Sequence, residues 1–246
     1  MTEQETTQEE MKSLSKNKMH YCPGCSHVIL NRMIAEVIDE MGLREKTIAS
    51  APVGCSVLLY DYFTFDVIEC LHGRVPSVMA TIKRLQPDKF VLCYQGDGDL
   101  AAIGLNETIQ TANRGENLSV IFVNNAIYGM TGGHMAPTTL PGQKTLTTQD
   151  GRPEDDSPLK MCELIATLDK PVYVARVACN NADHNKDAKA AIKKAFQCQL
   201  DGKGYSFVEI LSTCHVGWKV PLKDALGIVQ NDMIPYFPLG VFKDNT

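Results

Sequence analysis

The sequence predicts an α/β fold, a doubly wound and mostly parallel sheet with helices on both of its faces. Apolar runs of strand length alternate with segments whose apolar residues recur at helical spacing, which is typical of this class. Two of these runs lead directly into polar turns, as expected for strands that deliver a functional site. The chain has 246 residues, of which 44% are hydrophobic and 22% charged, enough for one well-buried domain.

The elements follow in chain order from the same patterns. Helices are expected at 28–41, 100–113, 159–168 and 186–200, and strands at 89–94, 118–123, 172–177 and 205–211. Gly115 is the expected C-cap of the second helix. We divide the chain into a polar N-terminal arm (1–19), a globular domain (20–220) and a proline-spaced C-terminal tail (221–246) that packs on the domain or on a partner.

Composition narrows the function. The formal net charge of −5 gives no reason to expect nucleic acid as a partner. The first 19 residues lack the apolar core of a signal peptide, and no apolar run reaches membrane-spanning length. We therefore expect a cytoplasmic protein that does not contact a membrane.

The most informative segment is Gly96-Asp97-Gly98-Asp99, which is separated from Asn124-Asn125 by one predicted helix and one predicted strand. That length places both turns at the same edge of a parallel sheet, where phosphorylated ligands bind. The glycines permit unusual backbone conformations and close approach to a ligand. Asp97 and Asn125 supply oxygen donors suited to Mg²⁺ or Ca²⁺. The pattern predicts a metal–diphosphate site, and the alternative is an ordinary glycine turn beside an asparagine-rich loop.

The nine cysteines divide into two groups. Five occur singly in apolar or helical contexts and are expected to be small buried residues: Cys70, Cys93, Cys162, Cys179 and Cys198. The other four lie in turns or at a strand end: Cys22, Cys25, Cys55 and Cys214. Four thiolates in such positions suit either a tetrahedral zinc or an iron–sulfur cluster.

The Gly-Asp-Gly segment followed by Asn-Asn resembles the thiamine diphosphate motif. The resemblance implies that Asp97, Asn125 and the carbonyl of Ile127 hold Mg²⁺, which in turn holds the diphosphate of the cofactor. With the cysteines included, the chain beyond residue 19 resembles the β subunit of the 2-oxoacid:ferredoxin oxidoreductases. This implies the thiamine diphosphate-binding fold, and one [4Fe–4S] cluster on Cys22, Cys25, Cys55 and Cys214.

The same resemblance implies a set of cofactor contacts, which includes the turn Leu71-His72-Gly73-Arg74. The implied contacts are Gly54, Ser56, Leu71, His72, Gly73, Arg74, Gly96, Gly98, Asp99, Met130 and Thr131. The loop after the asparagines looks most like that of the 2-oxoisovalerate and some 2-oxoglutarate enzymes. It departs from family members that carry lysine where Gly132 stands, and from those with glutamine at His134.

The implied reaction is oxidative decarboxylation of a 2-oxo acid with CoA, giving acyl-CoA, CO₂ and reduced ferredoxin. The expected substrate is 3-methyl-2-oxobutanoate or another branched-chain acid, with 2-oxoglutarate or pyruvate as alternatives. The chain is too short for a second, pyrimidine-binding domain, so its activating glutamate is expected on an α subunit. The resemblance also implies γ and ferredoxin-like δ subunits, and activity only in that hetero-oligomer.

Two other classes are left open. A subunit of a non-oxidative decarboxylase keeps the thiamine motif but needs no thiolate cluster. An electron-transfer module holds zinc or iron but no thiamine. His27 lies beside the Cys22–Cys25 pair and is expected to cap its helix, to hydrogen-bond near the cluster or to contact the cofactor. Trp218 is expected to pack or to lie at an interface. The long connection 136–157 is expected to be functional or interfacial.

Overall fold

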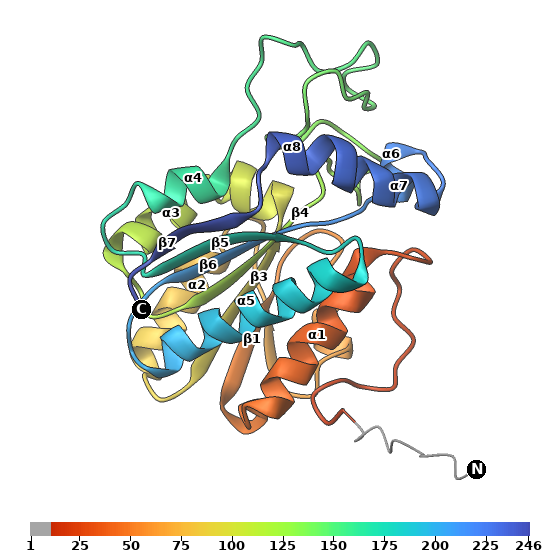
Figure 1. Ribbon diagram of the computed structural model, residues 1–246. Coiled ribbons are helices and arrows are strands. Elements are labelled where there is room, and N and C mark those ends of the chain that lie inside the picture. The colour runs from red at the N-terminus through yellow and green to blue at the C-terminus, as the bar shows by residue number, and fades with distance from the viewer. Residues whose placement is uncertain (1–10) are drawn as a thin grey trace, which may run out of the picture.

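Seven strands form one sheet in the computed structural model, which describes residues 11–246 (Figure 1). The spatial order is β2-β1-β3-β4-β6-β5-β7, and every neighbouring pair is parallel except β5 with β7. The strands are β1 (Thr47–Ala51), β2 (Asp66–Glu69), β3 (Phe90–Gly96), β4 (Ser119–Asn124), β5 (Tyr173–Ala178), β6 (Ser206–Leu211) and β7 (Gly240–Asp244).

Helices cover both faces of this sheet, as Figure 1 shows. The α-helices are α1 (Ser26–Glu40), α2 (Val75–Leu85), α3 (Leu105–Arg114), α4 (Met161–Ala166), α5 (Ala182–Leu200), α6 (His215–Trp218), α7 (Leu222–Ile228) and α8 (Ile234–Tyr236). Two 3₁₀ helices are η1 (Arg44–Lys46) and η2 (Leu59–Asp61), and two π-helical segments are η3 (Gly98–Ile103) and η4 (Val229–Met233).

Two apolar cores explain the layering. Helices α1 and α5 share one core with the strands, to which Ile34 and Phe196 contribute. Helices α2, α3 and α4 share the other, to which Met79 and Ile165 contribute. Strands β3, β4 and β6 are buried on both faces, which is why each reads as a nearly continuous apolar run. The predicted doubly wound fold is confirmed.

The register of β3 and β4 positions the site. Gly96 pairs with Val123, so Asp97, just after β3, and Asn124, the last residue of β4, lie side by side at the same edge. The structure confirms the juxtaposition predicted from the sequence. Gly115 has φ +66° at the end of α3, which confirms the left-handed C-cap.

Other elements differ from expectation. The helix expected from residue 100 opens as the π-helix η3, and α3 begins only at Leu105. The Gly104 N–H donates to the carbonyl of Asp99, five residues earlier, at 2.9 Å, and a Cβ on Gly104 would lie 2.8 Å from the Gly73 carbonyl oxygen, so this π-turn packs closely on the 71–74 turn. Helix α5 begins at Ala182, earlier than expected, because Asn181 accepts the His184 N–H at 2.8 Å as an N-cap.

Described residues of the predicted arm and of the predicted tail contact the domain. Residues 1–10 of the predicted arm lie outside the described residues, but Ser13 binds the Asp39 carboxylate and Leu14 bridges to Phe63. Residues of η4 and α8 pack against Ala178 and Leu211 at the carboxyl ends of β5 and β6, and β7 pairs with β5. No helix within residues 11–246 has the length and apolarity to cross a membrane.

Candidate functional site

The ends of β3 and β4 bring two oxygen-bearing side chains together. Asp97 and Asn125 are 3% and 9% exposed, and the Asn125 N–H donates to Asp97 Oδ1 at 3.2 Å. The Thr138 hydroxyl donates to Asp97 Oδ2 at 2.6 Å. Burial raises the pKa of Asp97 to about 7, against these two hydrogen bonds, which lower it. The carboxylate is therefore placed where a nearby cation would stabilise its charged form.

One atom indicates what the pair is arranged to hold. Asn125 Oδ1 is buried and has no hydrogen-bond partner. Buried polar atoms without a partner are uncommon in native proteins, and a bound ion is one of the explanations for them. A carboxylate and an amide oxygen are hard donors of the kind that Mg²⁺ takes. The residues present therefore fit a divalent cation.

A cavity of about 320 Å³ opens beside this pair. Its lining includes Asp97, Asn125 and Ile127, the three predicted cation ligands. It also includes eight of the predicted cofactor contacts: Gly54, Ser56, His72, Gly96, Gly98, Asp99, Met130 and Thr131. Leu71, Gly73 and Arg74 do not line it, and as cofactor contacts they stay a prediction. Leu71 is 80% exposed, and Arg74 pairs with Glu107.

The glycines of the motif act through space rather than through unusual torsion angles. Neither Gly96 nor Gly98 has a positive φ, so the expectation of a backbone conformation barred to other residues is wrong. A Cβ on Gly98 would lie 3.2 Å from the Tyr128 ring and 3.7 Å from His72. The absence of a side chain at Gly98 keeps the cavity open between these two rings.

Asp99 differs from Asp97 because its oxygens are already occupied. Oδ1 accepts the Gly73 N–H at 2.8 Å and lies 2.9 Å from His72 Nδ1, while Oδ2 accepts from Gln95 at 2.7 Å. The carboxylate thus ties the 71–74 turn to the Gly-Asp-Gly turn and fixes the His72 ring. With Nδ1 donating to Asp99, Nε2 is the ring nitrogen left for a ligand.

Of the four turn cysteines, Cys55 lines the cavity, and the other three lie near it. A Cβ on Gly129 would lie 2.8 Å from Cys214 Sγ and 3.7 Å from Cys55 Sγ, and both Gly129 and Cys55 line the cavity. Burial raises the pKa of Cys55 to about 11 and that of Cys214 to about 12. Cys25 raises both values further and Cys22 adds to the first, so the four thiols lie within electrostatic reach of one another.

In residues 11–246, no group of three or more His, Cys, Asp or Glu side chains is placed to hold a single metal ion. The choice between a zinc and an iron–sulfur centre on these cysteines stays a prediction. The five remaining cysteines are all buried, which confirms the prediction made for them.

His27 lines the cavity and is 5% exposed. Its Nδ1 lies 2.6 Å from the Tyr94 hydroxyl and 3.3 Å from Ser56 Oγ, and the Tyr21 ring stacks on it. Burial lowers the pKa of His27 to about 4, so the ring is neutral at neutral pH. Helix α1 has no side-chain cap, so the predicted capping role of His27 is wrong, while its hydrogen bonding near a cluster and its contact with a cofactor stay predictions.

Three contacts at the site were not predicted from the sequence, although Trp218 itself was expected to pack or to lie at an interface. Thr138 holds Asp97, Trp218 Nε1 donates to the Asn125 carbonyl at 3.0 Å, and Glu209 accepts from Asn124 Nδ2 at 2.7 Å. They come from a loop, a short helix and a neighbouring strand, and no local pattern marks them. His134, by contrast, lies outside the cavity lining, with Nδ1 2.8 Å from the Thr131 hydroxyl.

Comparisons with known proteins agree with this geometry. Residues 53–210 match the family model "Thiamine pyrophosphate enzyme, C-terminal TPP binding domain". The ketoisovalerate oxidoreductase subunit VorA of Methanothermobacter thermautotrophicus is 48% identical over 92% of this chain and 48% of its own length. The 2-oxoglutarate synthase subunit KorB of Methanocaldococcus jannaschii is 37% identical over 79% of this chain and 68% of its own.

A solved structure shows the same fold. The 2-oxoglutarate:ferredoxin oxidoreductase from Magnetococcus marinus superposes with a TM-score of 0.77 at 24% identity, over 98% of this chain and 87% of that one. The chain spans about half the length of the VorA relatives that it matches.

Proposed function

We propose a function from the premise that this chain belongs to the thiamine pyrophosphate enzyme family and, within it, to the subunits of 2-oxoacid:ferredoxin oxidoreductases. The chain binds the diphosphate end of thiamine diphosphate through Mg²⁺ and carries a [4Fe–4S] cluster. The observation that supports this most is the unpartnered Asn125 Oδ1 beside the Asp97 carboxylate, in a cavity that Cys55 also lines.

Each group has residues fitted to it. Asp97, Asn125 Oδ1 and the Ile127 carbonyl hold Mg²⁺, and His72, fixed by Asp99, offers Nε2 to the diphosphate. Cys22, Cys25, Cys55 and Cys214 hold the cluster. Bound thiamine diphosphate supplies the electron sink for decarboxylation, and the cluster takes up the two released electrons one at a time. The sum is 2-oxo acid, CoA and two oxidised ferredoxins giving acyl-CoA, CO₂, a proton and two reduced ferredoxins.

The proposed substrate is 3-methyl-2-oxobutanoate or another branched-chain 2-oxo acid. Among the described residues that line the cavity there is no lysine or arginine, while Val53, Ile103, Ile127 and Met130 are apolar. This chain therefore offers an apolar wall and no cationic partner for a second carboxylate. The naming of the 48% identical relatives as ketoisovalerate oxidoreductase subunits points the same way. 2-Oxoglutarate is the second candidate, from the 2-oxoglutarate synthase subunits.

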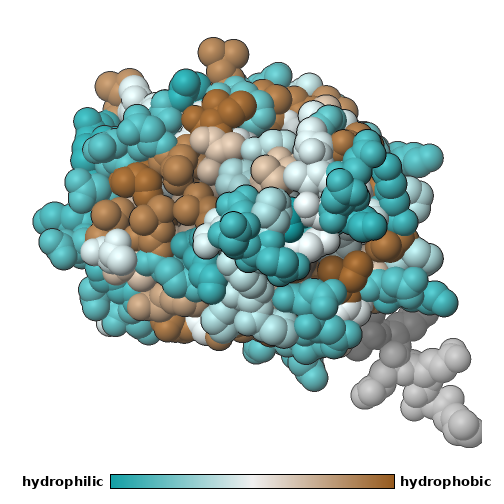
Figure 2. All heavy atoms as spheres, turned by 90° about the horizontal axis from the view of Figure 1, so that it is seen from above, coloured by the Kyte–Doolittle hydropathy of each residue, from teal (hydrophilic) through white to brown (hydrophobic). Residues whose placement is uncertain are grey.

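A partner subunit completes the site. No glutamate is among the described cavity-lining residues, so the activating glutamate comes from an α subunit. Leu71, Ile103 and Met130, near the cavity, are 80%, 52% and 59% exposed, as expected of side chains that a partner covers. Figure 2, which looks down on the molecule from above, shows brown apolar patches between polar residues. We also propose γ and δ subunits, and a cytoplasmic location in keeping with nine unpaired cysteines.

Anaerobic purification of the complex tests the proposal. Iron and sulfide analysis should give about four irons for this subunit, thiamine diphosphate and Mg²⁺ should co-purify, and turnover with 3-methyl-2-oxobutanoate should exceed that with 2-oxoglutarate or pyruvate. Absence of iron would favour a non-oxidative decarboxylase subunit. If Asp97→Ala left all ligand binding unchanged, the electron-transfer module without thiamine would be favoured instead.

A further inference from the structure

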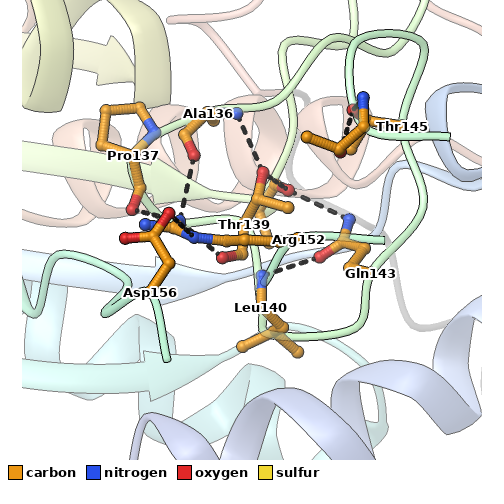
Figure 3. Close-up of polar contacts among 10 residues, drawn as sticks. Ala136, Pro137, Thr139, Leu140, Gln143, Thr145, Arg152 and Asp156 are labelled. Atoms are coloured by element: carbon orange, nitrogen blue, oxygen red, sulfur yellow. Dashed lines mark hydrogen bonds and ion pairs between the residues drawn. The ribbon is translucent and has the colours of Figure 1, made fainter. Parts of the chain in front are cut away.

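The loop between β4 and α4 is folded around one buried arginine. Arg152 is 6% exposed, and its Nη1 donates to the carbonyls of Thr139 at 2.7 Å, Pro137 at 2.9 Å and Ala136 at 3.4 Å (Figure 3). Its Nε donates to Asp156 Oδ2 at 2.9 Å. A buried guanidinium is costly unless its donors are satisfied, so this set of acceptors specifies the path of residues 136–139.

The residues that Arg152 holds in turn contact the cation turn. The Thr138 hydroxyl donates to Asp97 Oδ2 at 2.6 Å, as described above. The Thr139 hydroxyl and Gln143 Nε2 both donate to the Ala126 carbonyl, at 2.7 and 3.0 Å. In Figure 3 the dashed contacts of Thr139 and Gln143 meet at one carbonyl oxygen, while the Arg152 guanidinium points toward Pro137 and Asp156.

The segment that these donors hold is strained. Ala126 has φ +56°, a left-handed conformation that is unfavourable for a residue with a Cβ. Such strain persists only where the surroundings fix it. Asn124 Oδ1 accepts the Ala126 N–H at 3.0 Å, and the loop supplies both donors to the Ala126 carbonyl. The conformation of Ala126 decides where the preceding Asn125 and the following Ile127 lie.

We propose that Arg152 and Thr138 are positioning residues for the cation site. Arg152 fixes the loop, and the loop holds the Asp97 carboxylate through Thr138 and the Asn125–Ile127 turn through Thr139 and Gln143. Neither Arg152 nor Thr138 contacts the cation. The inference rests on the proposed function, because it assumes that Asp97 and Asn125 bind Mg²⁺.

Partners of metal ligands typically change metal affinity about 10- to 100-fold when removed. Thr138→Val and Arg152→Met should therefore each weaken cation binding by that factor. Thr138→Ser keeps the hydroxyl and should restore near-native affinity. Thr145→Val is the matched control, because Thr145 lies in the same loop and bonds Thr148 Oγ at 2.6 Å rather than Asp97.

The test uses the assembled complex, depleted of Mg²⁺ with a chelator and supplied with thiamine diphosphate. Mn²⁺ is the probe, and its dissociation constant is measured by electron paramagnetic resonance. Iron content and the apparent melting temperature are measured in parallel, so that a general loss of structure is recognised by a fall in both. Activity of Thr138→Val should return at saturating Mg²⁺.

Three outcomes are distinct. A 10- to 100-fold weaker Mn²⁺ affinity in Thr138→Val, with Thr138→Ser and Thr145→Val near native, supports the inference. Native affinity in both Thr138→Val and Arg152→Met overturns it and leaves the proposed function standing. A wild-type complex that binds no Mn²⁺ with thiamine diphosphate overturns the proposed function as well. If Arg152→Met does not fold, Thr138→Val and Thr138→Ser decide.

Discussion

Replacing Arg176 by methionine should strongly destabilise the fold, because Arg176 neutralises a carboxylate inside the sheet. Both Arg176 on β5 and Glu209 on β6 are 0% exposed, and Arg176 Nε lies 2.9 Å from Glu209 Oε2. Arg176 Nη1 also donates to Glu163 at 3.0 Å and to the Pro238 carbonyl at 3.2 Å. The guanidinium stacks on Phe242, with 4.8 Å between its central carbon and the ring centre.

The size of the destabilisation follows from the Glu209 carboxylate that is left without a partner. Arg176→Met leaves the Glu209 carboxylate buried without its countercharge, and breaking a buried pair in this way costs about 3–5 kcal/mol. At about 2–4 °C per kcal/mol for a chain of this size, the apparent melting temperature should fall by roughly 6–20 °C. Adding Glu209→Gln should recover about 1–3 kcal/mol of the lost free energy of unfolding. The glutamine carries no charge, and its side-chain oxygen still accepts the hydrogen bond from the Asn124 side chain.

The assay is thermal unfolding followed by circular dichroism at one scan rate. Lys186→Met is the control, since Lys186 pairs with Asp183 on the surface and its loss should cost less than about 1 kcal/mol. The reasoning is refuted if Arg176→Met has the same apparent melting temperature as the control. It is also refuted if the double variant is no more stable than Arg176→Met alone.

Three further changes test the site. Asp97→Asn should abolish retention of Mg²⁺ and thiamine diphosphate while iron content stays native; loss of iron as well would contradict separate sites. Gly129→Ala should lower the iron content at least several-fold, because its Cβ would lie 2.8 Å from Cys214 Sγ. The control Gly227→Ala should keep its iron, since its Cβ would meet only the Asn231 side chain, at 3.7 Å. Equal iron content in the two variants would refute the placement of the cluster. Prolonged chelation of Mg²⁺ should release thiamine diphosphate, measured by fluorescence after oxidation, and retained cofactor would show that the cation does not hold it.

The sequence predicted the parts of the site that local patterns encode. The apolar runs before Gly96 and Asn124 mark β3 and β4 because both strands are buried on both faces. Edge strands leave weaker signals. In β2 only Val67 is partly buried and the other residues are exposed, and β7 is mostly exposed, so neither shows a clear apolar run.

Contacts between segments that are far apart in the chain could not be predicted from the sequence. Thr138 reaches Asp97 across 41 positions, and Trp218 reaches Asn125 across 93. Their partners depend on how a loop and a short helix fold over the edge of the sheet. No local sequence pattern around a threonine or a tryptophan predicts such a contact. The π-helix at Gly98–Ile103, which packs closely on the 71–74 turn, was also missed.

The position of Cys55 affects how the activity of cysteine variants of this chain is interpreted. Cys55 is a proposed cluster ligand and also part of the cavity wall, whereas Cys22 is exposed and lies outside that wall. Under the proposed function, Cys55→Ser would remove an iron ligand and also change the wall of the cavity, so a loss of activity in this variant would have two causes. Cys22→Ser would leave the cavity wall intact, so slower transfer of electrons to an acceptor in that variant would be attributed to the proposed cluster.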